Sequence, residues 1–493
     1  MILSATETRD DILKKSLELY EAVRTTAGPK GGDYLFETPY GLATTHDGAT
    51  VARVVAELQG GNLISGAASA VERKVGDGTT AVISVTHHLI DQAYSLIAAK
   101  HNPIVLRDSI YTASTKALDQ LDTMATPATD LVAAATISSR DPKLGEIIGT
   151  IVKVTGADGS VIVEETDSLA DSYEIVEGYS FARGYTSPLM ANERKNAVYT
   201  STPILITDES ITSIQDLLPL LEKIGNKHNK LVVICGEVDE VALRQITTFS
   251  QKNPFSLLVI KAPFLAQERT HYLSDIAAMT GAVFVSGEMG YSITRLDPSM
   301  LGSADKVVST KDATTIIGGG GDPEAITSRI IELRDDNEMA RAAALDLKVA
   351  VIRVGGITVE EMSEKKYRVD DAVAATKAAL SGGIVPGGEV TLVRLAQSLS
   401  DETIGERILK VALVQPFRDI ITNAGLNADE KLPLIISAKD GYGFDLNAPD
   451  KLVDMKKAGI VDPMWVLREV ILNAVSIAGT AIKIGGSAYR DKE

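Results

Sequence analysis

The chain has 493 residues, 45% of them hydrophobic, 5% aromatic and 23% charged, a composition typical of folded globular proteins. Its 66 Asp and Glu residues against 49 Lys and Arg give a formal charge of −17, which disfavours a nucleic-acid partner because such a surface repels phosphates. A single cysteine rules out an internal disulfide. With no signal-peptide pattern and no run of about 18 apolar residues, no membrane contact is expected and the cytoplasm is the expected location.

The first part of the chain shows helical patterns. Apolar residues between Ile12 and Val23 recur at spacings of three and four, which predicts an amphipathic helix. A Gly- and Pro-rich segment at 26–32 ends it. A short strand pair is expected next, closing at Asp47-Gly48, which we interpret as a hairpin turn. A second amphipathic helix is expected over 82–96.

The middle of the chain has a different pattern. Short apolar runs predict strands at 203–208, 231–235, 256–262 and 282–286. Helical segments alternate with them near 213–224, 239–250 and 268–279. This alternation predicts parallel pairing and a compact α/β unit. Helices return at 366–381, 387–399, 404–424 and 464–484. The pattern therefore predicts one helical unit that is interrupted by an inserted α/β unit, with connectors near 124–176 and 350–381.

Several common sites can be excluded from their motifs. The chain contains no Gly-Lys pair and hence no P-loop, and its six histidines lack the spacing of a zinc protease. The run Gly318–Gly321 is followed at once by Asp322-Pro323-Glu324, which is typical of a helix start. We interpret the glycine run as a turn.

Gly76-Asp77-Gly78-Thr79-Thr80 precedes a predicted helix and has two interpretations. Small residues and a helix N-terminus can bind phosphate through backbone N–H groups, and Asp77 offers the hard oxygen that Mg²⁺ prefers. Asp and Thr are equally common as simple helix caps. The pentapeptide alone leaves both interpretations open.

Three other segments are individually weak signals. The stretch 26–31 and the pair Gly387-Gly388 each resemble ordinary helix ends or caps. Asp371 lies beside Asp370 in a predicted helix, where a solvated face is the default interpretation. Together these segments flank both halves of the split helical unit, and this makes a nucleotide site plausible.

Ordered motifs along most of the chain match a known family. They include TTAGPKG (25–31), THDGATVAR (45–53), GDGTTA (76–81), ATIS (135–138), VEGYSFARGYTSP (176–188), EKKYRVDDAVAATKAA (364–379), GGIVPGGEVTLVRLA (382–396) and AGIVDP (458–463). In these segments the chain resembles the group I chaperonins of the GroEL type, from about residue 8 to about residue 482.

The resemblance implies a mixed α and α/β multidomain, chaperonin-like fold. A helical equatorial ATPase domain (1–123 and 382–493) is expected to be split by an intermediate domain (124–176 and 350–381) and an inserted α/β apical domain (177–349). It also implies heptameric rings of this chain, stacked in pairs, that fold unfolded client proteins in a chamber. A lid co-chaperonin is a further candidate partner.

The resemblance also implies the residues of an ATP site with Mg²⁺ bound at Asp77, and K⁺ as a further candidate ion. Asp47 and Asp371 would orient the attacking water, the latter arriving when the intermediate segment closes. Nucleotide contacts map to Thr26, Ala27, Gly28, Pro29, His46, Asp77, Gly78, Thr79, Thr80, Ala81, Gly388, Asp445, Leu446, Asn447 and Asp462.

In the apical domain the family exposes an apolar strip that captures unfolded chains. By alignment the strip contains Tyr185, Leu189, Met190, Leu218, Leu221 and Leu243. For Leu218 and Leu221 the helical spacing is equally consistent with a place in the core.

The chain departs from the family at several of these positions. Glu389 stands where the family has the third glycine of a run, His46 stands where it has a lysine, and Thr247 and Thr248 replace two apical valines. The resemblance predicts an ATP-driven folding chaperonin. The departures leave a second hypothesis, a ring-forming holdase or scaffold with weak or no ATP hydrolysis.

Overall fold

The computed structural model describes residues 2–38, 41–59, 61–157, 159–166, 168–193, 196–263, 266–336, 338–346 and 348–488. The chain divides into two compact units. Unit 1 comprises Met1–Ala157, Val163–Asp171 and Arg353–Glu493, and unit 2 comprises Asp158–Ile162 and Ser172–Ile352. The sequence-based expectation of a helical unit interrupted by an α/β unit is confirmed.

Unit 1 is mainly helical. Its helices are α1 (Ala5–Arg24), α2 (Gly48–Leu58), α3 (Ser65–Val75), α4 (Thr79–Ala98), α5 (Pro103–Met124), α6 (Leu131–Ser139), α7 (Pro142–Thr155), α13 (Val359–Gly382), α14 (Val390–Ser398), α15 (Ile404–Leu413), α16 (Gln415–Asn423), α17 (Ala428–Ser437) and α18 (Met464–Lys483). Its two-stranded antiparallel sheets are β1 (Ile2–Leu3) with β19 (Ser487–Ala488), β2 (Tyr34–Thr38) with β3 (Gly41–Thr45), β15 (Ile384–Pro386) with β18 (Val461–Pro463), and β16 (Tyr442–Phe444) with β17 (Leu452–Asp454).

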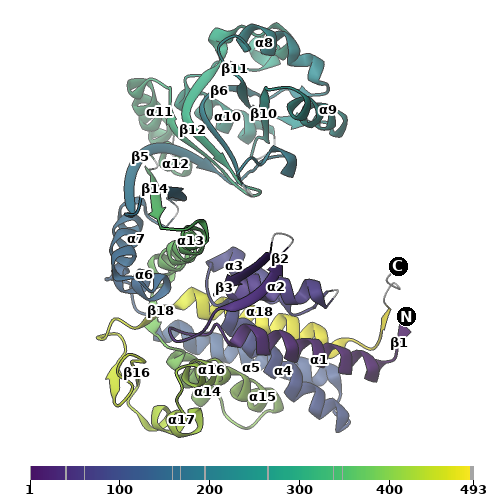
Figure 1. Ribbon diagram of the computed structural model, residues 1–493, viewed down its shortest axis with the longest axis vertical. Helices are drawn as coiled ribbons and strands as arrows, with labels where there is room; N and C mark the ends of the chain where they lie inside the picture. The colour runs from purple at the N-terminus through teal and green to yellow at the C-terminus, as the bar shows by residue number, and fades with distance from the viewer. Residues whose placement is uncertain are drawn as a thin grey trace. The chain divides into compact units, whose positions relative to one another are not determined.

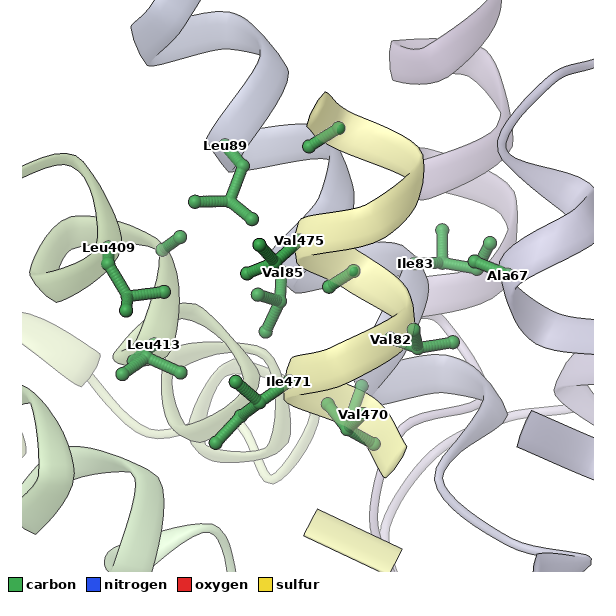
Figure 2. Close-up of a cluster of buried hydrophobic side chains, with 14 of the residues drawn as sticks. Ala67, Val82, Ile83, Val85, Leu89, Leu409, Leu413, Val470, Ile471 and Val475 are labelled. Carbon is green, nitrogen blue, oxygen red and sulfur yellow. The ribbon is translucent and has the colours of Figure 1, made fainter. Parts of the chain in front are cut away.

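Helix α18 is the central helix of unit 1, and it contacts α3, α4 and α5. Figure 1 shows it in yellow among the purple and blue helices from the start of the chain. Val470, Ile471 and Val475 of α18 meet Val82 and Val85 of α4 in a buried cluster (Figure 2). By length and composition alone α18 could cross a membrane, but 61% of its most apolar window is buried inside the protein. Core packing therefore accounts for its apolar character.

Unit 1 differs from the sequence-based expectation at one divided helix and at one helix that was not predicted. The helix expected over 404–424 is divided into α15 and α16, because Pro416 lies in the first turn of α16 and cannot supply the N–H that a continuous helix needs. Helix α17 was not predicted, since Pro433 lies inside it and Ile435 is its one buried residue.

A nine-stranded mixed sheet has the order β10-β8-β6-β12-β13-β5-β14-β4, with β11 paired to β6. Most of it belongs to unit 2, while residues 163–166 of β4 and 353–355 of β14 fall in unit 1. The strands are β4 (Ser160–Thr166), β5 (Ser172–Phe181), β6 (Ala197–Thr207), β8 (Lys230–Cys235), β10 (Ser256–Lys261), β11 (Phe284–Val285), β12 (Gly302–Ser309), β13 (Thr314–Gly319) and β14 (Lys348–Gly355). A small separate pair joins β7 (Ser210–Ile211) to β9 (Glu237–Val238). The helices are α8 (Leu218–Ile224), α9 (Glu240–Lys252), α10 (Ala266–Thr280), α11 (Pro323–Asp335) and α12 (Met339–Leu345).

The predicted parallel pairing in unit 2 is confirmed for β10, β8, β6 and β11. The sheet continues through β12, β13 and β5 in antiparallel pairs that the sequence did not reveal. The glycine run at 318–321 forms the end of β13 and the approach to α11, for which Asp322 is the N-cap. A side chain at Gly319 would come within 2.2 Å of the Met279 carbonyl oxygen, so glycine there permits close backbone contact.

Candidate functional site

The N-terminus of α4 has backbone N–H groups that no side chain caps. Helix α4 begins at Thr79, after Gly78 in the left-handed conformation at φ 85°. The Asp77 Oδ1 atom accepts a hydrogen bond from the Gly78 N–H at 2.6 Å rather than from the helix. Of the two interpretations left open for this segment, side-chain capping by Asp77 is not observed. The first-turn N–H groups and the positive end of the helix dipole remain suited to an anion.

The start of α2 lies directly against the start of α4. Asp47 is the N-cap of α2, and its carboxylate accepts hydrogen bonds from the N–H groups of Ala49 at 3.0 Å and Thr50 at 2.8 Å. The interpretation of Asp47-Gly48 as a hairpin turn was therefore wrong, because this carboxylate satisfies helix amides instead. A Cβ atom at Gly48 would lie 2.6 Å from Thr80 Oγ1, so glycine is required for this approach.

Helix α13 brings Asp371 to the same place. At Gly76, whose φ is 68°, an added Cβ would meet the Cβ of Ala374 at 2.2 Å, so α13 packs against the turn that carries Asp77. Asp371 is half-buried. Burial raises its pKa well above the ordinary value, and the negative charges of Asp47 and Asp77 raise it further. The solvated-face interpretation of Asp371 was wrong, and the structure brings Asp47, Asp77 and Asp371 together.

A second pair of carboxyl groups borders this cluster. Glu389 is the N-cap residue of α14, and its φ of 61° is rare outside glycine. Its Oε2 atom is buried and has no hydrogen-bond partner among the described residues. Burial raises the pKa of Glu389 well above its ordinary value, and Asp462 and Asp77 add to this rise. Burial likewise raises the pKa of Asp462 to about 7, although the N–H groups of Glu389 and Gly388 oppose the shift.

This charge crowding predicts a pH-dependent stability. An Asp whose pKa is raised in the folded state stabilises the fold at pH values below its unfolded pKa, near 3.8, and that stabilisation is lost as the pH rises through about 7. Without nucleotide or metal, the unfolding temperature is therefore expected to fall between pH 5 and pH 8. Asp462→Asn should flatten this decline, as measured by calorimetry. An identical pH dependence in the variant would contradict the assigned role of Asp462.

The remaining predicted nucleotide contacts lie on the loop after α1, on the first turn of α4 and on the loop after β16. Thr26 Oγ1 is 3.4 Å from Thr80 Oγ1, and Lys30 Nζ donates to Asn447 Oδ1 at 3.1 Å. Ala27 and Leu446 belong to one apolar cluster under these loops. Ala81 is buried in the first turn of α4, Gly28 and Asp445 are half-buried, and Pro29 and Asn447 are exposed.

Two side chains that the sequence analysis did not identify support the site. Asn423 donates from Nδ2 to the carbonyl oxygens of Arg24 at 2.7 Å and Ala27 at 3.0 Å, which fixes the loop after α1. Arg140 follows α6 and donates to Nε2 of His46. In the sequence, Arg140 lies between the ATIS motif and an Asp-Pro pair, a position that indicates the end of a helix. This was the one feature of the sequence that could have pointed to Arg140.

The carboxylate oxygens at this site fit a magnesium ion that is also coordinated by phosphate oxygens. The described residues contain no group of three or more His, Cys, Asp or Glu side chains arranged to hold a metal ion. Mg²⁺ commonly takes one or two carboxylates and completes its octahedron with water and phosphate oxygens. Asp77, which the sequence analysis assigned as the metal ligand, lies two residues before the first residue of α4.

The predicted apolar strip of unit 2 is only partly on the surface. Leu189 is 65% exposed, and Tyr185, Leu218 and Leu243 are half-buried against the core of the unit. Met190 and Leu221 are buried in that core, so placing them on a surface strip is corrected by the structure. Met190 faces inward, where its Sδ lies 3.4 Å from the Val259 amide nitrogen.

The two threonines that replace family valines on α9 have satisfied hydroxyl groups. Thr247 is buried and donates from Oγ1 to the Leu243 carbonyl oxygen at 2.9 Å. Thr248 is exposed and donates to the Arg244 carbonyl oxygen at 2.8 Å. These hydrogen bonds within the helix reduce the free-energy cost of placing hydroxyl groups at these positions. They do not restore the apolar surface that the family's two valines provide.

Comparisons with known proteins agree with this architecture. Residues 19–485 match the family model described as the TCP-1/cpn60 chaperonin family. Two crystal structures of the chaperonin gp146 from the bacteriophage EL 2 (Pseudomonas aeruginosa), both in the presence of ATP-BeFx, are similar over the whole chain. One has a TM-score of 0.68 at 20% identity and covers 100% of both chains. The other has a TM-score of 0.65 at 19% identity and covers 100% of this chain and 99% of that one. The fold expected from the sequence is confirmed.

Proposed function

Because the chain belongs to the TCP-1/cpn60 chaperonin family, we propose that it is an ATP-driven molecular chaperonin that captures non-native polypeptides and promotes their folding. The observation that carries the proposal is the convergence of Asp47, Asp77 and Asp371 at the uncapped N-terminus of α4. In the proposed mechanism, helix amides and Thr79 and Thr80 hold the phosphates, and Asp77 holds Mg²⁺.

Hydrolysis in this proposal depends on how the carboxylates are oriented. The Asp47 carboxylate is fixed by the helix amides it caps, and Asp371 on α13 lies near enough for the charge of Asp47 to add to the rise that burial causes in its pKa. Two oriented carboxylates can align a water molecule for in-line attack on the terminal phosphate. Bound Mg²⁺ would offset the repulsion that raises the pKa of Asp371 and so favour its charged form.

The domain division and the assembly are part of the same proposal. Residues 1–123 and 382–493 would form the nucleotide-binding domain, 124–176 and 350–381 the hinge-like domain, and 177–349 the client-binding domain. The family supports oligomeric rings enclosing a chamber, for which we propose heptamers of this chain.

The test of this function is refolding of a chemically denatured client enzyme with Mg-ATP, with Mg-ADP and without nucleotide. We expect recovered client activity to require ATP, together with steady-state phosphate release. If aggregation of the client is suppressed equally in all three conditions and no activity is recovered, the ATP-driven function is rejected.

One observation favours a second candidate, a ring-forming holdase that hydrolyses little or no ATP. The unpartnered carboxyl oxygen of Glu389 lies beside Asp462 and Asp77, where the charged form of this side chain would repel phosphate. Glu389→Gly distinguishes the two functions. A large gain of ATP turnover in this variant over a nearly inactive wild type would support the holdase.

Client capture is predicted to depend on Leu189, which is 65% exposed on the short turn Pro188–Met190. Leu189→Ser removes an apolar side chain worth about 1.5–3 kcal/mol on burial, so client binding should weaken about tenfold or more. Ile331→Ser on α11, also exposed, is the matched control. Fluorescence anisotropy with a labelled denatured client measures both, and equal losses would argue against a specific role for Leu189.

A further inference from the structure

A buried carboxylate joins three helices whose ends form the candidate site. Asp419 on α16 is buried, and its two carboxylate oxygens bind different helices. Oδ1 accepts a hydrogen bond from the Tyr20 hydroxyl of α1 at 2.6 Å, and Oδ2 accepts one from the Ser84 hydroxyl of α4 at 2.6 Å. No motif in the sequence pointed to these three residues, and the proposed mechanism does not use them.

Two imidazole rings of α4 hold the ring of Tyr20 in place. His87 stacks on it with ring centroids 4.9 Å apart, and His88 meets it edge-on at the same distance. Burial lowers the pKa of His87 to about 4, so its ring is neutral at pH 7. Burial and the charge of Asp419 raise the pKa of the Tyr20 hydroxyl, which therefore keeps its proton and acts as the donor.

Two of the three helices run from this carboxylate directly to the nucleotide site. Ser84 is one helical turn from Thr80, which lies in the first turn of α4. Thr26 follows Tyr20 by six residues, in the loop after α1, and its Oγ1 is 3.4 Å from Thr80 Oγ1. The carboxylate therefore connects the two segments that are predicted to contact the nucleotide.

The third helix, α16, also packs against the loop after α1. Asn423 at its end donates to the carbonyl oxygens of Arg24 and Ala27. An added Cβ at Gly28, whose φ is 74°, would lie 2.8 Å from Ile420 Cγ2, so helix and loop are in direct contact. Helix α16 thus binds α1 and its loop at several points and α4 at one.

We propose that Asp419 is a positioning residue of the nucleotide site, which binds Tyr20 and Ser84 together and so fixes the loop after α1 relative to the phosphate-binding end of α4. The inference rests on the proposed function, since it assigns support for that same site. A displacement of about 1 Å in binding groups can cost a hundredfold in function. Because ATP and ADP share the adenosine and two phosphates, affinity for both depends on this contact.

The test is calorimetric titration of the purified full-length protein with Mg-ADP and with a non-hydrolysable Mg-ATP analogue. Tyr20→Phe removes one donor to Asp419 and keeps the ring that packs on the two imidazoles. Affinity for both nucleotides should fall about tenfold, the size of one hydrogen bond to a charged group. Ser84→Ala removes the other donor and should have an effect of similar size.

The matched control is Tyr94→Phe, which makes the same chemical change elsewhere on α4. Tyr94 is buried like Tyr20, and its hydroxyl donates to the Ala481 carbonyl oxygen at 3.0 Å, near the other end of the helix. Both Phe variants lose a buried hydrogen bond, so both should unfold at a lower temperature than the wild type. Only Tyr20→Phe should lose nucleotide affinity, and this difference separates positioning from a general loss of stability.

A conservative variant at the carboxylate tests whether its hydrogen bonds are what matters. Asp419→Asn keeps an oxygen that accepts from Tyr20 and has an NH2 group that can donate to Ser84 Oγ, so it should retain affinity within about threefold of the wild type. A larger loss in Asp419→Asn than in Tyr20→Phe would overturn the inference, because the charge rather than the hydrogen bonds would then support the site.

The remaining outcomes are equally decisive. Weaker binding of both nucleotides in Tyr20→Phe and Ser84→Ala, with unchanged binding in Tyr94→Phe, supports the inference. Unchanged affinity in Tyr20→Phe, or equal losses in the two Phe variants, overturns it while leaving the ATP site intact. If the wild type binds neither nucleotide, the proposed function and this inference both fail.

Discussion

Asp371→Asn is expected to reduce steady-state ATP turnover about a hundredfold or more, the range usual for removing an oriented acid–base group. The substitution preserves the shape of the side chain on α13 and removes the charge that faces Asp47 and Asp77. Because burial and like charges already raise the pKa of Asp371, its loss should not lower the unfolding temperature. A loss of turnover without a loss of stability would identify a functional rather than a structural role.

The matched control for that experiment is Asp370→Asn. Asp370 precedes Asp371 on the same helix but is exposed, and we place it outside the site. Both variants replace one carboxyl group of α13 by an amide, so phosphate release at saturating Mg-ATP can be compared directly. Equal turnover in the two variants would contradict the role that we assign to Asp371.

The second large effect is expected in unit 2, at a buried ion pair. Asp275 is fully buried, and its carboxylate accepts hydrogen bonds from Nε of Arg341 at 2.7 Å and from Nη2 of Arg341 at 2.8 Å. Arg329 donates to the same carboxylate from Nε at 3.2 Å, so the pair joins α10 to α11 and α12. Removing one partner of a buried pair leaves an uncompensated charge and costs about 3–5 kcal/mol.

Asp275→Ala is therefore expected to increase hydrogen exchange strongly in the strands of unit 2. Glu332→Ala is the control, because Glu332 is exposed and also accepts a hydrogen bond from Arg329, at 3.2 Å. Exposed pairs contribute about 0–1 kcal/mol, so this control should exchange nearly as the wild type does. Similar protection in both variants, measured by mass spectrometry, would show that the buried pair does not stabilise the unit.

The sequence predicted those parts of the fold whose pattern is local. Parallel strands such as β8 and β10 are buried on both faces and therefore appear as continuous apolar runs. Strand β12, with the sequence GSADKVVS, mixes buried and exposed positions, and a search for apolar runs does not detect it. Of its two antiparallel partners, β6 lies far away in the sequence and could not be deduced from local patterns, whereas β13 follows after a short turn.

The candidate site was only partly predictable for a similar reason. Glycines around Asp77 indicated phosphate binding, but capping could be judged only from hydrogen bonds in the fold. The role of Asp371 required knowing that α13 packs on the turn at Gly76, more than 290 residues earlier in the chain. The burial of Leu221 depends on how α8 packs, which helical spacing does not determine.

A structure of the particle determined with Mg²⁺ and an ATP analogue that mimics the terminal phosphate would test the central claim most directly. We predict a triphosphate at the N-terminus of α4, a magnesium ion bound to Asp77, and the carboxylates of Asp47 and Asp371 directed at the terminal phosphate. Clear density for the fold with this site empty at saturating analogue, or with those carboxylates turned away from the nucleotide, would contradict it.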